Sequence, residues 1–396
     1  MKGGLKTFKR ELILPILAVA SLMLTVDCAR AQSWTLQTNP PQATWRSVCC
    51  SADGTKITAV NGKLYVSTNS GKSWAISGNT NSPNWGVIAC SADGTKFIAA
   101  SNASAIYLST NSGASWQAPT NVVFMSSITS VASSTNGNTL LTGSSLLVAP
   151  GGAVISSTNG GLTWTTNLTS AGWGPVACSA DGTILAAASY DSSIFVSTNS
   201  GRTWATNNSP SELWEAMALS ADGSTLAAAG NNTSIYVTTN LGITWKTNDS
   251  PVNSWRAMAL SADGTKLVAA APGGGIYTST NAGINWVSNG VPSVAWFSAA
   301  SSADGSKLVA IGYGSNGGIY TWQAVPSLNL GVTNGGLLLS WPYLSSTTNY
   351  GLQQNGDLTM TNWAAVTNQP GVTNGQYQVM LPPQSGNLFY RLLQGQ

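Results

Sequence analysis

One eight-residue phrase recurs six times in this chain and limits its possible folds more than any other feature. Each copy reads Ser/Thr-x-Asn-x-Gly-x-x-Trp, and the copies end at Trp74, Trp116, Trp164, Trp204, Trp245 and Trp286. Successive tryptophans are 42, 48, 40, 41 and 41 residues apart. A fixed period near 40 residues indicates a solenoid or a propeller, because each repeat then forms one supersecondary unit that packs on its neighbours.

The unit from Trp214 to Trp245 shows how one repeat is built. The segments WEAMALS, TLAAAG, SIYVTT and WKTN are short and apolar or alternating, which predicts four strands. Between the first two lies the turn SADGS, where Asp222 suits a turn position and Gly223 suits positive φ. Four short antiparallel strands in about 41 residues form one blade of a propeller.

A second motif, the SADG turn, gives an independent count of the units. It recurs at Asp53, Asp93, Asp181, Asp222, Asp263 and Asp304, with Asn136 at this position in the third unit, and so marks seven units against six phrases. The last unit runs through Trp322 and stops one strand short, while SWTLQT from Ser33 is an isolated strand at the other end. We therefore predict an all-β fold, a seven-bladed β-propeller over residues 32–323, whose N-terminal strand completes the seventh blade and removes its open edge.

The repeated phrase resembles the Asp-box, or BNR repeat, of sialidases, sortilin-type receptors and the photosystem II assembly factors of the HCF136 class. The resemblance implies a hairpin between the third and fourth strands of each blade. In it the Asn side chain bonds the turn backbone, the Gly takes positive φ and the Trp packs on the blade. It also implies that the boxes are structural and lie on the face away from the working site. The residues concerned are Asn69, Gly71, Trp74, Asn111, Gly113, Trp116, Asn159, Gly161, Trp164, Asn199, Gly201, Trp204, Asn240, Gly242, Trp245, Asn281, Gly283 and Trp286.

Residues 324–396 carry a different pattern. Alternating or apolar runs (LLLSWPYL, TTNYGLQQN, TNWAAV, QYQVMLPP and NLFYRLL) are separated by Gly, Asn and Pro turns. This predicts a linker followed by a small β-sandwich. The pattern resembles a C-terminal module found on exported proteins of Verrucomicrobia and Planctomycetes.

Residues 1–31 have the composition of a signal peptide. Lys2, Lys6, Lys9 and Arg10 precede an almost wholly apolar run at 12–26, and Ala29-Arg30-Ala31 offers a cleavage site. The apolar run is shorter than the roughly 18–20 residues that a membrane-spanning helix needs. We expect cleavage after Ala31 and a secreted, cell-surface or periplasmic protein. A membrane anchor and a lipoprotein acylated at Cys28 are the alternatives.

Loss of this segment changes the charge of the chain. It holds five of the sixteen basic and two of the thirteen acidic residues, so the remainder has eleven of each. A near-neutral chain without a basic patch gives no reason to expect a nucleic-acid partner, and no membrane span is expected after cleavage.

Four cysteines follow the signal segment: Cys49, Cys50, Cys90 and Cys178. An even number in an exported protein is compatible with disulfides. However, Cys50, Cys90 and Cys178 share one repeat position, which later units fill with Leu219 and Leu260. A position that accepts Cys or Leu is an apolar packing site, so we expect buried free thiols. The chain has no histidine, and no metal site or cofactor is predicted.

The best candidates for a binding site follow the first residue of each inner strand. That first residue is Trp45, Trp85, Trp173, Trp214, Trp255 or Trp296, with Ile128 in the third unit. These tryptophans either pack between blades or form a ring that stacks on a ligand. The next position reads Arg46, Gly86, Thr129, Gly174, Glu215, Arg256 and Phe297. Topology places it on the top face, opposite the SADG turns and boxes. We take Arg46, Glu215 and Arg256, with the loop residue Asp191, as candidate ligand-binding residues. The alternative is a stabilising ion pair between Glu215 and Arg256.

These residues do not complete a known catalytic set. Sialidase chemistry needs three arginines on a carboxylate, a tyrosine–glutamate nucleophile and an acid/base carboxylate. The predicted propeller holds Arg46, Arg202 and Arg256, and Arg202 lies within a box on the bottom face. We therefore expect an exported, non-catalytic propeller that binds a glycan or protein partner through its top face. The alternatives are a glycoside hydrolase using Glu215 and Asp191, and an assembly factor, for which the near-neutral chain offers little charged surface. The ligand and the oligomeric state are left open.

Overall fold

The computed structural model describes residues 34–40, 43–77, 83–101, 105–120, 122, 127–145, 152–170, 172–190, 193–247, 249–314, 317–324, 328–333, 336–342, 350–357, 360, 362–373, 376–382 and 388–394. These residues form strands, turns and bends but no helix, as the all-β prediction requires. Among them, accordingly, no helix is long and apolar enough to cross a membrane. The predicted signal segment lies outside the described residues.

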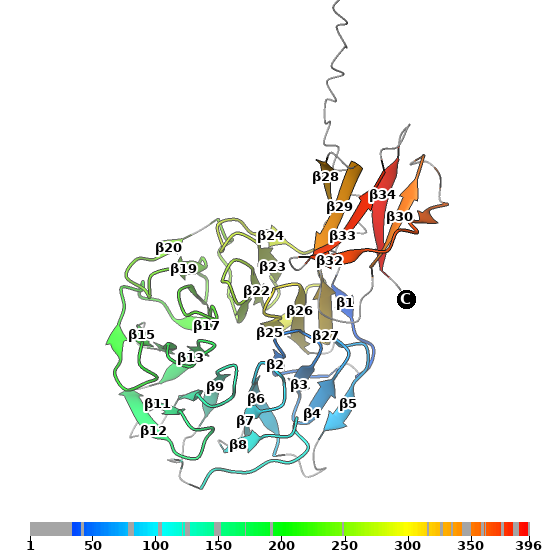
Figure 1. The fold of residues 1–396 in the computed structure, drawn as a ribbon. Helices are drawn as coiled ribbons and strands as arrows, with labels where there is room; N and C mark the ends of the chain where they lie inside the picture. The colour runs from blue at the N-terminus through cyan, green and yellow to red at the C-terminus, as the bar shows by residue number, and fades with distance from the viewer. Residues whose placement is uncertain are drawn as a thin grey trace, which may run out of the picture. The chain divides into compact units, whose positions relative to one another are not determined.

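Seven antiparallel sheets form the repeat region, and Figure 1 shows them arranged around a common centre. Sheets 1 to 3 contain β2 (Ser47–Cys50), β3 (Ile57–Val60), β4 (Leu64–Ser67) and β5 (Ala75–Ser77); β6 (Trp85–Cys90), β7 (Phe97–Ser101) and β8 (Ile106–Ser109); and β9 (Ile128–Ser133), β10 (Leu140–Ser144), β11 (Gly152–Ser157) and β12 (Thr165–Ser170). Sheets 4 and 5 contain β13 (Trp173–Cys178), β14 (Leu185–Ser189), β15 (Ile194–Ser197) and β16 (Ala205–Thr206); and β17 (Trp214–Leu219), β18 (Leu226–Gly230), β19 (Tyr236–Thr238) and β20 (Lys246–Thr247). Sheet 6 contains β21 (Ala257–Leu260), β22 (Leu267–Ala271), β23 (Gly275–Ser279) and β24 (Val287–Ser288).

Sheet 7 joins the two ends of the repeat region. It contains β25 (Ala295–Ser301), β26 (Lys307–Tyr313) and β27 (Ile319–Gln323), and β1 (Thr35–Leu36) adds its fourth strand. In the antiparallel β1–β27 pair, Thr35 lies opposite Thr321 and Leu36 opposite Tyr320. This pairing confirms the predicted closure by the N-terminal strand.

The SADG turns are themselves linked into a closed ring by backbone hydrogen bonds. In each link the residue before the turn aspartate donates its N–H to the carbonyl of the equivalent residue in the next repeat, at 2.6–2.9 Å. The donors run in order through Ala52, Ala92, Thr135, Ala180, Ala221, Ala262 and Ala303, which donates back to Ala52. Four lysines add a second link, since Lys56, Lys96, Lys266 and Lys307 reach carbonyls of the following turn at 2.6–3.0 Å. The bottom face is thus held by contacts between neighbouring repeats.

Each box forms a compact turn on the same face. In the first, the Ser67 hydroxyl and the Ser73 N–H donate to Asn69 Oδ1 at 3.0 and 2.8 Å, and Trp74 Nε1 donates to the Gly71 carbonyl at 2.8 Å. The six box glycines have φ between 77° and 88°. The residue before each of them is also left-handed, as at Ser70 (φ 57°), which the sequence pattern does not indicate.

The tryptophans that begin the inner strands are buried, with 0–3% of their surface exposed. Each packs edge-on against an aromatic ring of the third strand of its own sheet, at centroid distances of 5.0–5.6 Å. They therefore fill the cores between sheets, and the alternative of a ligand-stacking tryptophan ring is wrong.

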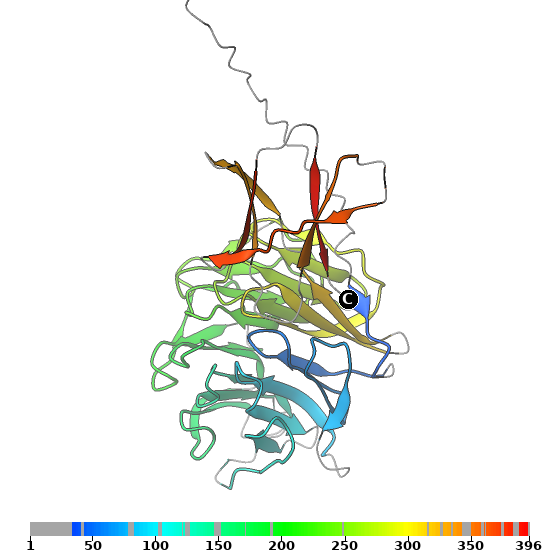
Figure 2. The same cartoon turned by 45° about the vertical axis from the view of Figure 1, so that its right-hand side comes forward.

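The C-terminal segment forms two sheets of its own. One contains β28 (Asn329–Thr333), β29 (Gly336–Pro342), β33 (Gln376–Leu381) and β32 (Gly371–Thr373), and the other contains β31 (Ala364–Ala365), β30 (Tyr350–Asn355) and β34 (Phe389–Gln394). Figure 2 shows them as separate layers. Leu339, Trp341, Val379 and Leu381 of the first sheet share a core with Leu352 of the second, which makes the segment a small β-sandwich.

Candidate functional site

The top face is the end of the propeller where the inner strands begin. Boxes and SADG turns share the opposite, bottom face, because Ser70 N donates to the Thr55 carbonyl at 2.8 Å and other repeats make the equivalent bond. On the top face, the second position of the inner-strand segments is small at Gly86, Thr129 and Gly174 and large at Glu215, Arg256, Phe297 and Arg46. The two halves of the ring of inner strands therefore differ in what they present.

Glu215 and Arg256 form an ion pair between neighbouring sheets. Arg256 Nη1 lies 2.5 Å from Glu215 Oε2, and the side chains of Glu215 and Arg256 remain 31% and 41% exposed. The ion pair that the sequence offered as the alternative to a ligand site is therefore present, and it lies at the surface rather than in a core. Surface pairs of this kind contribute little to stability, about 0–1 kcal/mol.

Arg256 also contacts an aromatic pair in sheet 7. Its guanidinium carbon lies 5.2 Å from the centroid of the Phe297 ring, a cation–π arrangement. Phe297 in turn stacks on Tyr313 at 5.9 Å with 29° between the ring planes. Tyr313 is 45% exposed, so the stack has an open side.

Tyr190 extends this arrangement toward sheet 4. Partial burial raises the pKa of its hydroxyl, the nearby Glu215 carboxylate acts in the same direction, and Arg256 acts in the opposite one. A Cβ at Gly174 would lie 2.9 Å from the Trp214 carbonyl and 3.4 Å from the Tyr190 ring, so glycine makes room for this close approach. Tyr190 is 38% exposed. We call Tyr190, Glu215, Arg256, Phe297 and Tyr313 the aromatic–charged band.

Sequence reasoning missed the two tyrosines of the band and did not select Phe297 as a site residue. A signal for the tyrosines exists in the repeat alignment. In each repeat the count starts at the first apolar residue of the second strand, which is Ile57 in the first repeat. The sixth residue is then Gly62, Asn102, Ser145, Tyr190, Asn231, Pro272 or Tyr313. Two aromatic residues at a position otherwise filled by small or polar ones mark a departure from the structural repeat.

The remaining candidates are placed differently. Arg46 is half-buried and directly precedes β2, on which Val48 N donates to Ser298 Oγ of β25 at 3.3 Å. Since these strands are neighbours, Arg46 occupies the ring position next to Phe297. Asp191 lies outside the described residues, so its relation to Glu215 stays a prediction.

Most other carboxylates of the propeller are engaged within turns. The six SADG aspartates accept hydrogen bonds from the serine two residues before them and from the backbone N–H two residues after, and all six have a lowered pKa. Glu212 accepts a bond from the Tyr236 hydroxyl at 3.2 Å. Within the part of the chain that the structure describes, no group of three His, Cys, Asp or Glu residues could hold a metal ion.

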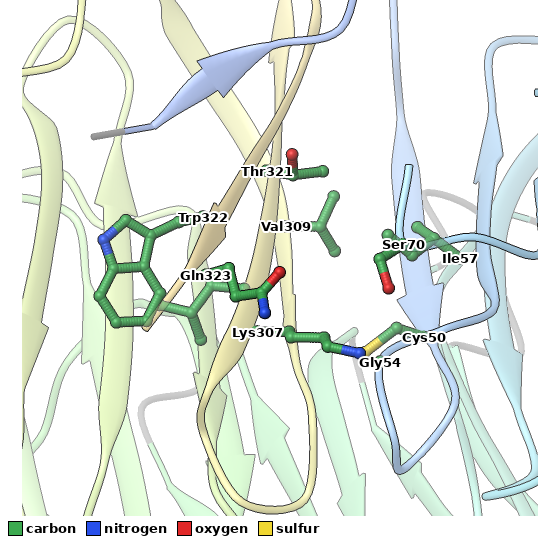
Figure 3. A pocket seen from close by; sticks show the side chains of 10 residues that line it. Cys50, Gly54, Ile57, Ser70, Lys307, Val309, Thr321, Trp322 and Gln323 are labelled. Atoms are coloured by element: carbon green, nitrogen blue, oxygen red, sulfur yellow. The ribbon is translucent and has the colours of Figure 1, made fainter. Parts of the chain in front are cut away.

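A cavity of about 40 Å³ lies on the bottom face, between sheets 7 and 1 (Figure 3). Lys307, Thr321 and Gln323 line one side, and Cys50 and Ser70 the other. This volume holds only one or a few water molecules. It is remote from the band along the strands and too small for an organic ligand.

The solved structures that are similar to this chain in fold include two of YCF48. One is of YCF48 bound to D1 peptide, with a TM-score of 0.56, 17% identity, and coverage of 74% of this chain and 97% of that one. The other is of YCF48 from Cyanidioschyzon merolae, with a TM-score of 0.56, 15% identity, and coverage of 74% and 98%. No family model and no curated protein matches the chain. At this identity the likeness shows the fold alone, that of a β-propeller, and this agrees with the expected resemblance to the photosystem assembly factors in its fold.

Proposed function

We propose that this chain is an exported, non-catalytic propeller that binds an extended segment of a partner protein across its aromatic–charged band. The observation that carries the proposal is the contiguity of the band. Glu215, Arg256, Phe297 and Tyr313 contact one another in sequence from sheet 5 to sheet 7, Tyr190 of sheet 4 lies near enough to Glu215 and Arg256 for both charges to act on its pKa, and all five side chains stay partly exposed.

The composition of the band favours a protein partner. Tyr and Arg are enriched among the residues that dominate protein–protein affinity, since they combine apolar area with hydrogen-bonding groups. Two neighbours orient Arg256: the Glu215 carboxylate, through the ion pair, and the Phe297 ring, through its face. Side chains held in place before binding lose less conformational entropy when the partner arrives.

The guanidinium of Arg256 suits a peptide backbone. It has five N–H donors, and among the described residues one of them is bonded, to Glu215. The others can donate to carbonyl oxygens of an extended chain, while Tyr190 and Tyr313 offer hydroxyl groups at the two ends of the band. The YCF48 structure with D1 peptide supports the view that a propeller of this fold can hold a peptide.

The same geometry argues against hydrolysis at Glu215. A glycosidase of the expected kind needs two carboxylates about 5–10 Å apart, one of them protonated at the start of the reaction. The Glu215 carboxylate is already engaged by the Arg256 guanidinium. Asp191, the second carboxylate of the hydrolase alternative, lies outside the described residues, so that alternative depends on a pair not yet observed.

Peptide selection tests the proposal. The full-length chain, immobilised, would be used to select binders from a phage-displayed random peptide library. The affinities of the selected peptides would then be measured for wild type, Arg256→Ala, Phe297→Ala and Arg202→Ala. We expect binding to weaken by roughly 10-fold or more in the two band variants, the usual effect of losing a central contact. Arg202→Ala, an exposed arginine on the bottom face, should bind like wild type.

Three outcomes would contradict the proposal. One is that no peptide is enriched, or that the enriched peptides bind all four proteins equally. Another is binding on a glycan array that is lost in Phe297→Ala, which would identify a carbohydrate ligand instead. The third is turnover of a 4-methylumbelliferyl glycoside that is lost in Glu215→Gln, which would identify an enzyme.

A further inference from the structure

Cys49 departs from an otherwise uniform repeat position. The third residue of SVCC in the first repeat is Cys49, whereas the equivalent residues of the other six repeats are Ala89, Ala132, Ala177, Ala218, Ala259 and Ala300. A small residue is therefore sufficient for the fold at this place. The thiol of Cys49 is an addition that the architecture does not require.

The side chain at this position faces the next repeat. Across the interfaces of the propeller it shares a core with the residue that occupies the Cys50 position of the following repeat: Ala132 with Cys178, Ala177 with Leu219, Ala218 with Leu260, and Ala300 with Cys50. By the same register Cys49 faces Cys90, and these two residues share the core between sheets 1 and 2.

Contacts between β2 and β6 bring the two cysteines close to each other. Cys90 Sγ lies 3.3 Å from the Cys50 carbonyl, on the strand that carries Cys49. On the same pair of strands, Ile88 N donates to Ser47 Oγ at 3.1 Å. Cys90 is also among the neighbours that raise the pKa of the Cys49 thiol, after burial, so the two side chains lie near each other.

The side chains of the other two cysteines face different neighbours. Cys50 projects from the opposite face of β2, toward Lys307 and Val309 of sheet 7 (Figure 3). Cys178 faces Ala132. The four cysteines of the described residues are free thiols in this structure, as the sequence predicts.

We propose that Cys49 and Cys90 are a cross-linking site, at which a disulfide joins the first and second repeats of the propeller. The oxidant is a small-molecule or protein disulfide. One cysteine thiolate attacks it and releases one thiol, and the other cysteine then displaces the second thiol from the mixed disulfide. Two cysteine protons and two electrons leave the chain, and the oxidant is reduced to two thiols.

Burial dictates when this exchange takes place. Cys49 is 8% exposed, and its burial, more than any neighbouring group, raises the pKa of its thiol. The thiolate is the reactive form, so the folded, reduced protein reacts slowly. The cross-link therefore forms while the two repeats are not yet packed, and once formed it is protected from reductants by the same core.

Thiol mapping tests the site. The full chain would be unfolded in guanidinium and refolded either with glutathione disulfide and glutathione or with dithiothreitol. Free thiols would then be alkylated, and unreduced peptides would be mapped by fragmentation mass spectrometry. In the sample refolded with glutathione we expect a disulfide-linked peptide that joins Cys49 and Cys90. The chain in that sample should carry two fewer alkylated thiols than the chain refolded with dithiothreitol. The oxidised protein should melt roughly 5–10 °C higher, since the bond closes a loop of about 40 residues in the unfolded chain.

Two variants supply matched controls. Cys49→Ala restores the residue of the other six repeats and should fold normally, form no intramolecular disulfide, and melt at the same temperature with and without dithiothreitol. Cys178→Ala should keep the cross-link. The proposal is overturned if the refolded wild type has no Cys49–Cys90 peptide, if the disulfide instead joins Cys50 or Cys178, or if dithiothreitol lowers the melting temperature of Cys49→Ala as much as that of wild type.

Discussion

The asparagine of each box stabilises its turn through one oxygen atom. In the fourth repeat, Asn199 Oδ1 accepts hydrogen bonds from the Ser197 hydroxyl at 3.0 Å and from the Thr203 N–H at 2.9 Å, while Nδ2 donates to the Thr203 hydroxyl at 2.8 Å. The side-chain carbonyl oxygen therefore accepts one bond from the backbone and one from the Ser197 hydroxyl. An aspartate would keep both, whereas an alanine would leave the backbone donor without its acceptor.

Substitution of Asn199 should separate the two roles of the amide. We expect Asn199→Ala to lower the free energy of unfolding by about 1–2 kcal/mol, the cost of an unmade hydrogen bond, and Asn199→Asp to change it by less than about 0.5 kcal/mol. Urea unfolding followed by tryptophan fluorescence measures both, with the neighbouring exposed Arg202→Ala as control. Equal destabilisation by Ala and Asp would show that the amide nitrogen matters instead.

At the residue scale the sequence predicted part of the candidate site. The Glu215–Arg256 pair follows from register, since both residues hold the same position in neighbouring repeats. The sequence did not predict that Tyr190 and Tyr313 belong to the site. They lie at the end of the second strand of their sheets, and the distance of that end from the inner strand depends on sheet twist.

The SADG turn is the element that links neighbouring repeats, and its aspartate is the acceptor within it. Asp93 accepts from the Ser91 hydroxyl at 2.5 Å, the Thr95 N–H at 3.0 Å and the Thr95 hydroxyl at 2.8 Å. These bonds, that from Ser91 first, lower the pKa of the carboxyl to about 2. Asn136 accepts equivalent bonds in the third repeat without a charge, from Ser134 and from Asn138 N.

Acid should therefore destabilise the propeller through these turns. Because the folded pKa of Asp93 lies below the ordinary aspartate value of about 3.9, its contribution is complete above that pH and is lost as the pH falls toward about 2. We expect the urea midpoint of wild type to fall between pH 5 and 2.5, and that of Asp93→Asn to fall less. Asp249→Asn, which changes an exposed carboxylate outside the turns, is the control. A wild-type midpoint that is constant down to pH 2.5 would contradict this account.

The closed ring is the feature of the whole molecule on which the candidate site depends. The band spans sheets 4 to 7, and sheet 7 is completed by the two residues of β1. Leu36 of β1 packs into the core between sheets 6 and 7 and lies close to Gly318, where a Cβ would meet its side chain. The neighbouring Thr35 is exposed.

A charge at Leu36 should open this closure. We expect Leu36→Asp to lower the free energy of unfolding by about 2 kcal/mol or more, the cost of an unpaired charge in an apolar core. The exposed edge of β27 should also make the protein associate with increasing concentration. Urea unfolding and light scattering measure these effects. Thr35→Asp, on the outward side of the same strand, should leave both unchanged, and similar behaviour of the two variants would show that β1 does not hold the ring closed.

The sequence by itself determined the sheets, their turns and the strand that closes them. These features follow from local patterns that every repeat carries: apolar residues that alternate with a period of two, turn residues at fixed offsets, and a repeat length near 40. The tertiary structure decided which non-repeated residues meet. Tyr190, Glu215, Arg256, Phe297 and Tyr313 form one band, and Cys49 reaches Cys90, because neighbouring sheets pack in a particular register. That register arises from packing between sheets, which no single repeat encodes.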